Sequence, residues 1–263
     1  MMRKVFQKMY LYLLLLFLYV PIGVLVVNSF NESRFRAKWG GFTLNWYREL
    51  LADEAIMMAL YYTIVVALLS AVISTVIGTA ASIALSNFKS KKLQKLVMFI
   101  SYIPVLNPDI VTGISLMLLF LFFKISLGFN TMLIAHITFG IPFVILSVLP
   151  KLRQSDSKLY EAALDLGCTP MQALFKVVLP DIKPGIITGF LLAFTMSIDD
   201  FVISYFTTAS GVSNISIEVY SMARMKISPK VNAVSTIMFV TVLLLMIVVE
   251  YRKNKQEKTK VTN

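Results

Sequence analysis

The sequence predicts an all-α integral membrane protein with six transmembrane helices, for three reasons. Of its 263 residues, 57% are hydrophobic and only 15% are charged, whereas a soluble domain usually has about 25% charged residues. Its mean hydropathy of +0.77 is too high for a chain that must coat its own surface with polar groups. The apolar residues also gather in six long stretches, and most of the charged residues lie between them. Lipid is therefore the expected solvent for most of the chain.

Each apolar stretch is long enough to cross a membrane as a helix. A hydrocarbon core about 30 Å thick takes about 20 mostly apolar residues, and a helix pairs its backbone polar groups internally. The second and third stretches are long enough to tilt or bend. No Pro-, Gly- or Ser-rich linker divides the chain, so residues 1–263 are expected to form a single transmembrane domain. The six predicted spans are Met9–Val27, Ile56–Leu85, Leu96–Phe123, Thr131–Leu149, Ile186–Phe206 and Val231–Val249.

The basic residues predict how the spans are oriented. Lys and Arg are enriched in cytoplasmic segments, and about twice as many lie on one side of the predicted spans as on the other. This distribution places both termini in the cytoplasm. The first stretch follows Arg3, Lys4 and Lys8, as a signal peptide would, but no small-x-small cleavage site follows it, so we predict an uncleaved span. We therefore attribute the net charge of +11 to basic residues that orient the spans in the membrane, and we expect membrane lipid but no nucleic acid as a partner.

The chain has little material for enzymatic chemistry or metal binding. Its single cysteine, Cys168, excludes a disulfide framework and a CxxC site, and its single histidine, His136, excludes multi-histidine metal sites. No GxxxxGK(S/T) sequence is present, so any ATP chemistry must lie in another chain. We therefore expect no catalytic residue, no metal site and no cofactor in this chain. His136 is expected to be a hydrogen-bonding contact between helices rather than a substrate ligand.

Residues 150–185 form the longest interior segment, and we predict a helical hairpin there on the inner membrane face. Asp156 or Ser157 can cap the first helix, and Gly167 supplies the positive-φ residue that ends it. The apolar positions of this helix recur at i, i+3, i+4 and i+7, which makes one narrow stripe. These positions are Leu159, Ala162, Ala163 and Leu166.

A second helix start follows at once. Thr169 is the expected N-cap, with proline in the first helical position and Gln172 three residues after the cap. The helix is expected to run to Val178 and to stop before Leu179-Pro180, because proline disfavours a helical residue before it. Two interpretations remain open. The hairpin merely connects two spans, or its stripe of small residues packs closely against another helix or into a groove.

The same segment resembles the EAA motif of ABC-importer permeases, written EAA-x3-G-x9-I-x-L-P. It has Glu161-Ala162-Ala163, then Gly167, then Val177-Val178-Leu179-Pro180, and departs only in valine at 177 in place of isoleucine. The resemblance implies a type I ABC-importer permease fold, whose coupling helix docks into a cleft on a separate cytoplasmic ATPase. The residues that it implies for this coupling are Glu161, Ala162, Ala163, Gly167, Leu179 and Pro180.

Four further segments resemble more narrowly the spermidine/putrescine permeases of the PotC type. With the EAA loop, the likeness covers most of residues 90–250. It implies a bacterial inner-membrane transporter made of this subunit, a paralogous permease, an ATPase dimer that binds ATP and Mg²⁺, and an extracytoplasmic polyamine-binding protein. The four segments are Asn107–Val111, His136–Phe139, Ser197–Asp200 and Tyr220–Met222.

Three carboxylates lie within the predicted spans. Each costs about 2.5–3.5 kcal/mol near a helix centre, so such residues usually face a cavity or a partner. A path for a polyamine needs carboxylates for its ammonium groups and aromatic or apolar walls for its methylenes. The candidate path residues are the acids Asp109, Asp199 and Asp200, the aromatic residues Tyr102, Phe201 and Tyr205, and Glu218 on the outer loop.

The residues leave the roles of these acids open. Asn107 can cap a helix that restarts after a break with Pro108 in its first position, so Asp109 is either part of this cap or part of the path. Asp199 and Asp200 are adjacent, so on a helix they point roughly 100° apart and cannot both face one pore. Asp200 is slightly favoured, because the residues that continue its side are polar or aromatic.

Three classes of function compete at this stage. An ATP-driven importer permease for polyamines is favoured, and a permease for another small solute would share the same inner loop. A gradient-driven cation transporter would also need the intramembrane acids, but it would not need a docking helix. A membrane enzyme has the least support, because one histidine and one cysteine offer no cluster of nucleophile and base.

Overall fold

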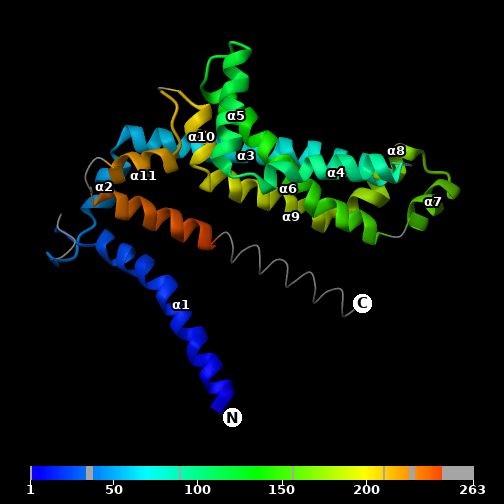
Figure 1. Ribbon diagram of the computed structural model, residues 1–263. Coiled ribbons are helices and arrows are strands. Elements are labelled where there is room, and N and C mark those ends of the chain that lie inside the picture. Colours follow the sequence, from blue (N-terminus) through cyan, green and yellow to red (C-terminus); the bar gives the residue numbers. More distant parts are fainter. Residues whose placement is uncertain are drawn as a thin grey trace. The chain divides into compact units, whose positions relative to one another are not determined.

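The computed structural model describes residues 2–33, 38–88, 90–155, 157–209, 211–224 and 229–244. Apart from one antiparallel bridge between Asn31 and Phe42, the regular structure in these ranges is helical (Figure 1). The chain divides into two compact units, which are Met1–Met57 with Glu218–Asn263, and Met58–Ile217. The second unit contains most of the predicted site residues.

Three predicted spans are confirmed as long apolar helices. The first, second and fourth spans lie in α1 (Met2–Ser29), α3 (Glu54–Ser86) and α6 (Phe129–Gln154). With the helix Pro170–Asp199, these are the four helices of the described residues that are long and apolar enough to cross a membrane. The all-helical fold class is therefore confirmed, whereas the count of six spans is not reproduced one for one.

The third predicted span, Leu96–Phe123, is not one straight helix. It is divided into α4 (Lys91–Leu106) and α5 (Asp109–Phe122), which meet at an angle of 105°. Asn107 is extended, with φ −74° and ψ 143°, because the ring of the following proline disfavours the helical region. The predicted Asn107 cap is wrong: Pro108 occupies the N-cap position of α5, and no side-chain hydrogen bond caps this helix.

The last two predicted spans also differ from the structure. In place of one helix over Ile186–Phe206, α9 (Leu179–Asp199) ends and the short α10 (Val202–Thr207) follows. Hydropathy gave no sign of this interruption, because the residues on both sides of it are apolar. The predicted span Val231–Val249 begins in the helix Lys230–Leu244, and its last five positions lie outside the described residues.

The predicted hairpin is largely confirmed. Helix α7 (Ser157–Asp165) is followed by Gly167 at φ +86°. Thr169 and Gln172 form the expected capping box: Thr169 Oγ1 accepts from the Gln172 amide at 3.3 Å, and Gln172 Oε1 accepts from the Thr169 amide at 3.1 Å. The alternative cap, Asp156, lies outside the described residues.

One prediction for the hairpin is wrong, because the second helix does not end before Leu179-Pro180. Helix α8 (Pro170–Ala173) continues through the π-helical turn η1 (Leu174–Val178) directly into α9. Proline normally breaks a helix because its ring clashes with the carbonyl four residues earlier. The wider π-helical turn just before Pro180 changes the position of that carbonyl, which lets the chain remain helical.

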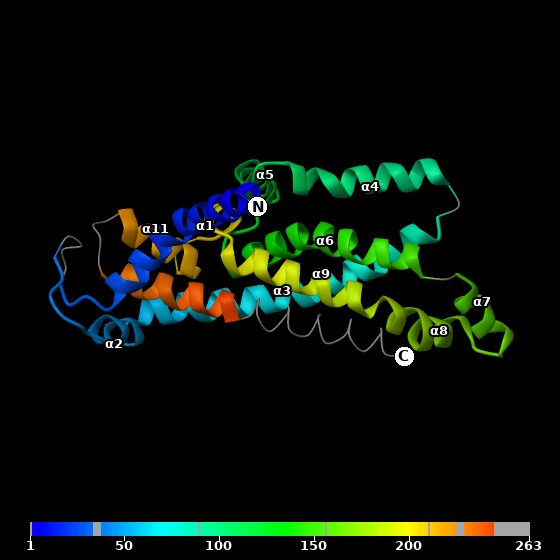
Figure 2. The same ribbon diagram turned by 90° about the horizontal axis from the view of Figure 1, so that it is seen from below.

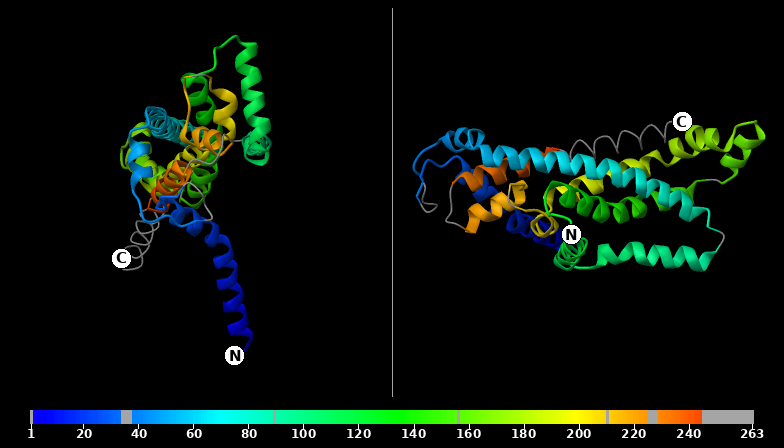
Figure 3. Two further views of the ribbon diagram at one scale, coloured as in Figure 1. Left: turned by 90° about the vertical axis from the view of Figure 1, so that its left-hand side faces the viewer. Right: turned by 90° about the horizontal axis from the view of Figure 1, so that it is seen from above.

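Close packing of α3, α6 and α9 forms the core of the second unit. The three helices run side by side (Figures 2 and 3), and the fully buried Val144 of α6 lies between the other two. A Cβ atom on Gly78 of α3 would lie 2.7 Å from the Cβ of Val144, and one on Gly189 of α9 would lie 3.1 Å from its Cα. Small residues thus let the helix backbones approach, as is common among helices in membranes.

In the first unit, α2 (Asn45–Leu51) carries the contacts that order the segment after α1. Trp46 is buried and donates from Nε1 to the carbonyl oxygen of Asn31 at 2.7 Å. At the end of the same segment, Lys230 Nζ lies 3.4 Å from Asp53 Oδ2. These contacts tie the last described helix to the loop that precedes α3.

Candidate functional site

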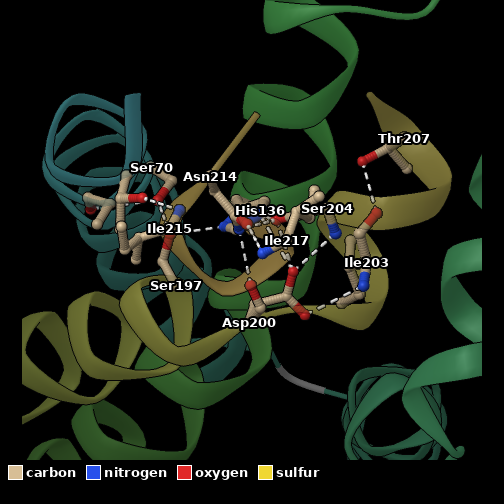
Figure 4. A network of polar contacts seen from close by, with 12 residues as sticks. Ser70, His136, Ser197, Asp200, Ile203, Ser204, Thr207, Asn214, Ile215 and Ile217 are labelled. Carbon is tan, nitrogen blue, oxygen red and sulfur yellow. Dashed lines mark hydrogen bonds and ion pairs between the residues drawn. The ribbon is translucent and has the colours of Figure 1, made fainter. Parts of the chain in front are cut away.

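Asp200 occupies the interruption between α9 and α10, and its carboxylate caps α10. Its backbone leaves the helical region at φ −68° and ψ 125°. Oδ1 accepts the amide N–H of Ile203 at 3.1 Å, and Oδ2 accepts the amide N–H of Ser204 at 2.7 Å and its hydroxyl at 2.8 Å (Figure 4). The first turn of a helix has amide groups without intrahelical partners, so this carboxylate satisfies donors that the interruption exposes.

His136 of α6 reaches across to the same interruption. Its Nδ1 lies 2.6 Å from the hydroxyl of Ser197 on α9, and its Nε2 lies 2.8 Å from the hydroxyl of Ser204 on α10. Nε2 is also 3.4 Å from Asp200 Oδ2, and the His136 and Asp200 side chains are only 3% and 7% exposed. The predicted role of His136 as a hydrogen-bonding contact between helices is confirmed by these distances.

Polar residues from two further segments complete this cluster. Ser70 of α3 donates to the Ser197 hydroxyl at 3.2 Å. The buried amide of Asn214 donates to the Asp200 carbonyl and to the Ser204 hydroxyl, both at 2.8 Å. Asn214 also accepts the amide N–H of Ile217 in α11 (Ile215–Arg224) at 2.9 Å. We call the following set the Asp200 network: Ser70, His136, Ser197, Asp200, Ser204 and Asn214.

One arrangement of protons satisfies every member of the Asp200 network. Ser204 donates its proton to Asp200 and receives that of Asn214, so its hydroxyl can accept a further proton from His136 Nε2. Ser197 receives a proton from Ser70 and can donate its own to His136 Nδ1. These donors and acceptors are matched when the imidazole carries its one proton on Nε2.

Asp199 differs from Asp200 in its exposure and in its contacts. It is the last residue of α9 and is exposed. Among the described residues, no hydrogen bond or ion pair engages its carboxylate. The nearby rings of Phe201 and Tyr205 lie 5.5 Å apart between centroids, and Tyr205 is 49% exposed. Because Asp200 lies outside the helix, the expected separation of 100° between two helical neighbours does not apply.

The other candidate path residues lie on separate elements. Asp109 is the first residue of α5 and is exposed, and Tyr102 is exposed on α4. Helix α5 packs against α10, where a Cβ on Gly113 would lie 3.1 Å from the ring of Phe206. No hydrogen bond or ion pair among the described residues joins Asp109 to Asp199 or Asp200. The half-buried Glu218 lies in the first turn of α11 and belongs to the other compact unit.

Four of the six residues predicted for coupling are exposed, and two are buried or half-buried. Glu161 and Ala162 on α7 are exposed, as is Gly167 at the turn. The other three motif residues show different burial: Ala163 is buried, Leu179 is half-buried against the core of the second unit, and Pro180 is exposed. Of the neighbouring residues, Leu166 is 86% exposed and Cys168 is half-buried.

A groove of about 720 Å³ lies beside this hairpin, where α7, α8 and η1 meet the ends of α3 and α6. Its walls are mainly apolar, and Glu161 is its one acidic residue among the described ones. The groove is lined by Ile83, Ser86, Asn87, Leu152, Ser155, Leu159, Tyr160, Glu161, Pro170, Met171, Leu174, Val177 and Val178. An apolar, exposed hairpin at one end of a helix bundle is a surface suited to a partner chain.

Comparison with known proteins decides the family. Residues 75–251 match the family described as binding-protein-dependent transport system inner membrane component. The chain belongs to this family. The permease is 38% identical over 244 residues to the spermidine/putrescine transport system permease protein PotC of Escherichia coli (strain K12), covering 93% of this chain and 91% of that one. It is 36% identical over 251 residues to the putrescine transport system permease protein PotI of the same organism, covering 93% and 89%.

A solved structure shows the same fold. The permease matches a chain of a bacterial ABC transporter involved in the import of the acidic polysaccharide alginate, with a TM-score of 0.78 and 17% identity. The match covers 95% of this chain and 96% of that one. The expected ABC-importer permease fold is thus confirmed, and the family description places the permease in an inner membrane as part of a binding-protein-dependent system.

The sequence pattern did not indicate two members of the Asp200 network. Ser70 of the permease is a single polar residue in an apolar stretch, and such residues are common at helix contacts in membranes, whereas Asn214 lies in a segment that contains several serines. Their partners are far away in sequence: Ser70 and Ser197 are separated by 127 residues. A signal that could have drawn attention to Asn214 is its position just before α11, where asparagine is a favoured N-cap.

Proposed function

We propose that the permease is one transmembrane subunit of an ATP-driven importer of polyamines. The observation that carries the substrate class is the identity of 38% and 36%, over 93% of this chain, to relatives named for spermidine/putrescine and putrescine transport. The intramembrane acids support it, because ammonium groups need carboxylates inside a membrane. The rings of Phe201 and Tyr205 suit the methylenes and also attract cations.

The driving force in this proposal comes from partner chains. The permease itself catalyses no reaction and holds no cofactor, while a cytoplasmic ABC ATPase dimer binds ATP and Mg²⁺. The exposed residues of the hairpin support this docking, because Leu159 of α7 and Leu166, just after its end, leave apolar surface open to a partner. A paralogous permease and an extracytoplasmic polyamine-binding protein complete the transporter, and both termini of the permease lie in the cytoplasm.

Uptake by the purified complex in liposomes tests this function. We expect labelled spermidine or putrescine to enter when ATP, the ATPase and the binding protein are present, with no competition from amino acids or inorganic anions. Competition by another small solute would favour a permease of different specificity. Uptake that persists without the ATPase and ATP would instead favour a gradient-driven cation transporter.

The coupling surface can be tested within one helix. Glu161→Lys reverses a charge on the exposed face of α7, and Gly167→Pro changes the turn that follows it, so both variants should strongly reduce ATP-driven uptake. Asp165→Lys is the matched control, because Asp165 is exposed on the same helix but at a position that the motif leaves undefined. Equal uptake by the Glu161 variant and the control would remove the coupling role.

A further inference from the structure

The two adjacent acids at the end of α9 differ in their contacts. The carboxylate of Asp200 is buried and accepts hydrogen bonds from α10, whereas Asp199 is exposed. We propose that Asp200 and His136 are positioning residues that fix the interruption between α9 and α10, and that the network thereby presents Asp199 as the carboxylate that meets the cationic substrate. The part concerning Asp199 rests on the proposed polyamine function. The part concerning the Asp200 network does not depend on any substrate.

The first step concerns the acceptor capacity of Asp200. Its carboxylate already takes three donors from α10 and faces His136 Nε2 at 3.4 Å. A cation that bound here would have to enter a site where the side chain is 7% exposed. It would also displace donors of α10 that would then remain buried without partners, and that displacement is costly. Asp200 is therefore occupied by the protein itself.

The second step concerns the two helix ends that meet at the interruption. The C-terminal end of α9 carries the negative end of its dipole, and the N-terminal end of α10 carries the positive end. Asp200 compensates the positive end of α10 by capping it. What remains is the negative end of α9 together with the exposed carboxylate of Asp199, which is an arrangement that favours a cation.

The third step concerns what holds this geometry. His136 comes from α6 and Asn214 from the segment after α10, so the interruption is tied to two elements that lie outside it (Figure 4). Asn214 binds the carbonyl of Asp200, which fixes the backbone immediately after Asp199. Loss of the network would release the end of α9, so His136 acts on transport through the position of Asp199.

Thermal unfolding of the assembled complex tests the positioning role without any substrate. His136→Gln and Asp200→Asn should each lower the melting midpoint by about 5 °C or more, and the double variant should melt close to the worse single variant, because both remove one coupled interaction. The matched cycle of His136→Gln with Asp199→Asn should be additive. If Asp200→Asn fails to assemble, Ser204→Ala replaces it in the first cycle. Additive effects in the first cycle would overturn the positioning role.

Uptake kinetics test the part that concerns Asp199. Asp199→Asn should raise the apparent KM for spermidine about tenfold, which corresponds to about 1.4 kcal/mol, while its melting midpoint stays near that of the unaltered complex. Asp199→Glu should restore most of the affinity. Asp200→Asn should lower the maximal rate together with the midpoint. A selective rise in KM for Asp200→Asn, or none for Asp199→Asn, would overturn this assignment.

The two parts of the proposal fail separately. If the unaltered complex takes up no polyamine, the proposed function and the assignment of Asp199 are both overturned. The unfolding cycles still decide the role of the Asp200 network, because they contain no polyamine.

Discussion

Two predicted spans of the permease are interrupted, and the two interruptions are stabilised in different ways. Between α4 and α5, the break is made by the backbone: Pro108 forces Asn107 out of the helical region, and no side chain caps the new helix. Between α9 and α10, the break is made by side chains, because Asp200 caps α10 and His136 holds Asp200. Each break has acidic residues beside it, but among these acids Asp200 alone accepts hydrogen bonds from the described part of the chain.

This difference indicates whether the carboxylate at each break is available to a cation. A carboxylate that satisfies buried donors fixes its segment and is not free for a passing cation. A carboxylate that is exposed at a helix end, like Asp109 or Asp199, keeps its charge available. The two interruptions should therefore respond differently to the same substitution, and the following experiments order the expected effects from large to small.

The largest effect should come from removing the two carboxylates in parallel. Asp200→Ala leaves two amide donors of α10 and the Ser204 hydroxyl without their acceptor in a buried site, so we expect a loss of about 3 kcal/mol or more in unfolding free energy. Asp109→Ala removes only an exposed charge at a helix N-terminus, worth about 0.3–1 kcal/mol. Thermal or denaturant unfolding of the assembled complex measures both. Similar losses for the two variants would contradict the distinction between the breaks.

A second pair compares the asparagines beside the breaks. Asn214 is 2% exposed and makes three hydrogen bonds, so Asn214→Ala should cost about 2 kcal/mol. Asn107→Ala changes an exposed residue whose side chain caps nothing, so its cost should stay within about 0.5 kcal/mol. Hydrogen exchange of the α10 amides should rise in the first variant and stay unchanged in the second. Unchanged exchange in both would show that Asn214 does not support the interruption.

A third experiment tests whether the break at Pro108 is a backbone effect. Pro108→Ala restores an amide and frees the residue before it, so α4 and α5 can approach one continuous helix. The cost in stability should be about 1 kcal/mol or less, but the distance between spin labels on α4 and α5 should become longer and broader. Pro104→Ala is the control, because Pro104 lies inside α4 and its removal should leave the angle across the break unchanged. An unchanged distance in Pro108→Ala would show that packing, rather than proline, sets the angle of 105°.

The contrast between a break made by the backbone and one made by side chains from distant segments also explains which features could be predicted from the sequence. Signals that depend on neighbouring residues were read correctly: the long apolar runs of α1, α3 and α6, the positive φ of Gly167 and the capping box of Thr169 and Gln172. Each of these is determined within a few residues, so a single sequence contains all the information needed.

Features that depend on distant partners were mostly not predicted: the role of His136 as a contact between helices was, but its partners were not. The hydrogen bonds of His136 to Ser197 and Ser204 join residues that are 61 and 68 positions apart. These contacts lie at the interruption where Asp200 leaves the helix, and no local pattern indicated them. The proline at Pro180 was misread for another reason: whether a proline ends a helix depends on the geometry of the preceding turn, and here that turn is π-helical.

A similarly small effect should come from the turn after α7, which is a third kind of break because a glycine makes it. Gly167 has φ +86° and nothing lies within 4 Å of a Cβ built on it, so Gly167→Ala meets no steric obstacle and pays only for the left-handed backbone, about 1 kcal/mol. Gly23→Ala in α1 is the control, since that site is equally open but helical, where alanine is favoured by about 1 kcal/mol. The two variants should shift the melting midpoint in opposite directions. ATP-driven uptake should fall in Gly167→Ala alone, because the strain is located in the turn after α7, the helix that we propose docks on the ATPase. A fall in uptake without a loss of stability would place Gly167 in contact with the partner rather than in the turn that supports it.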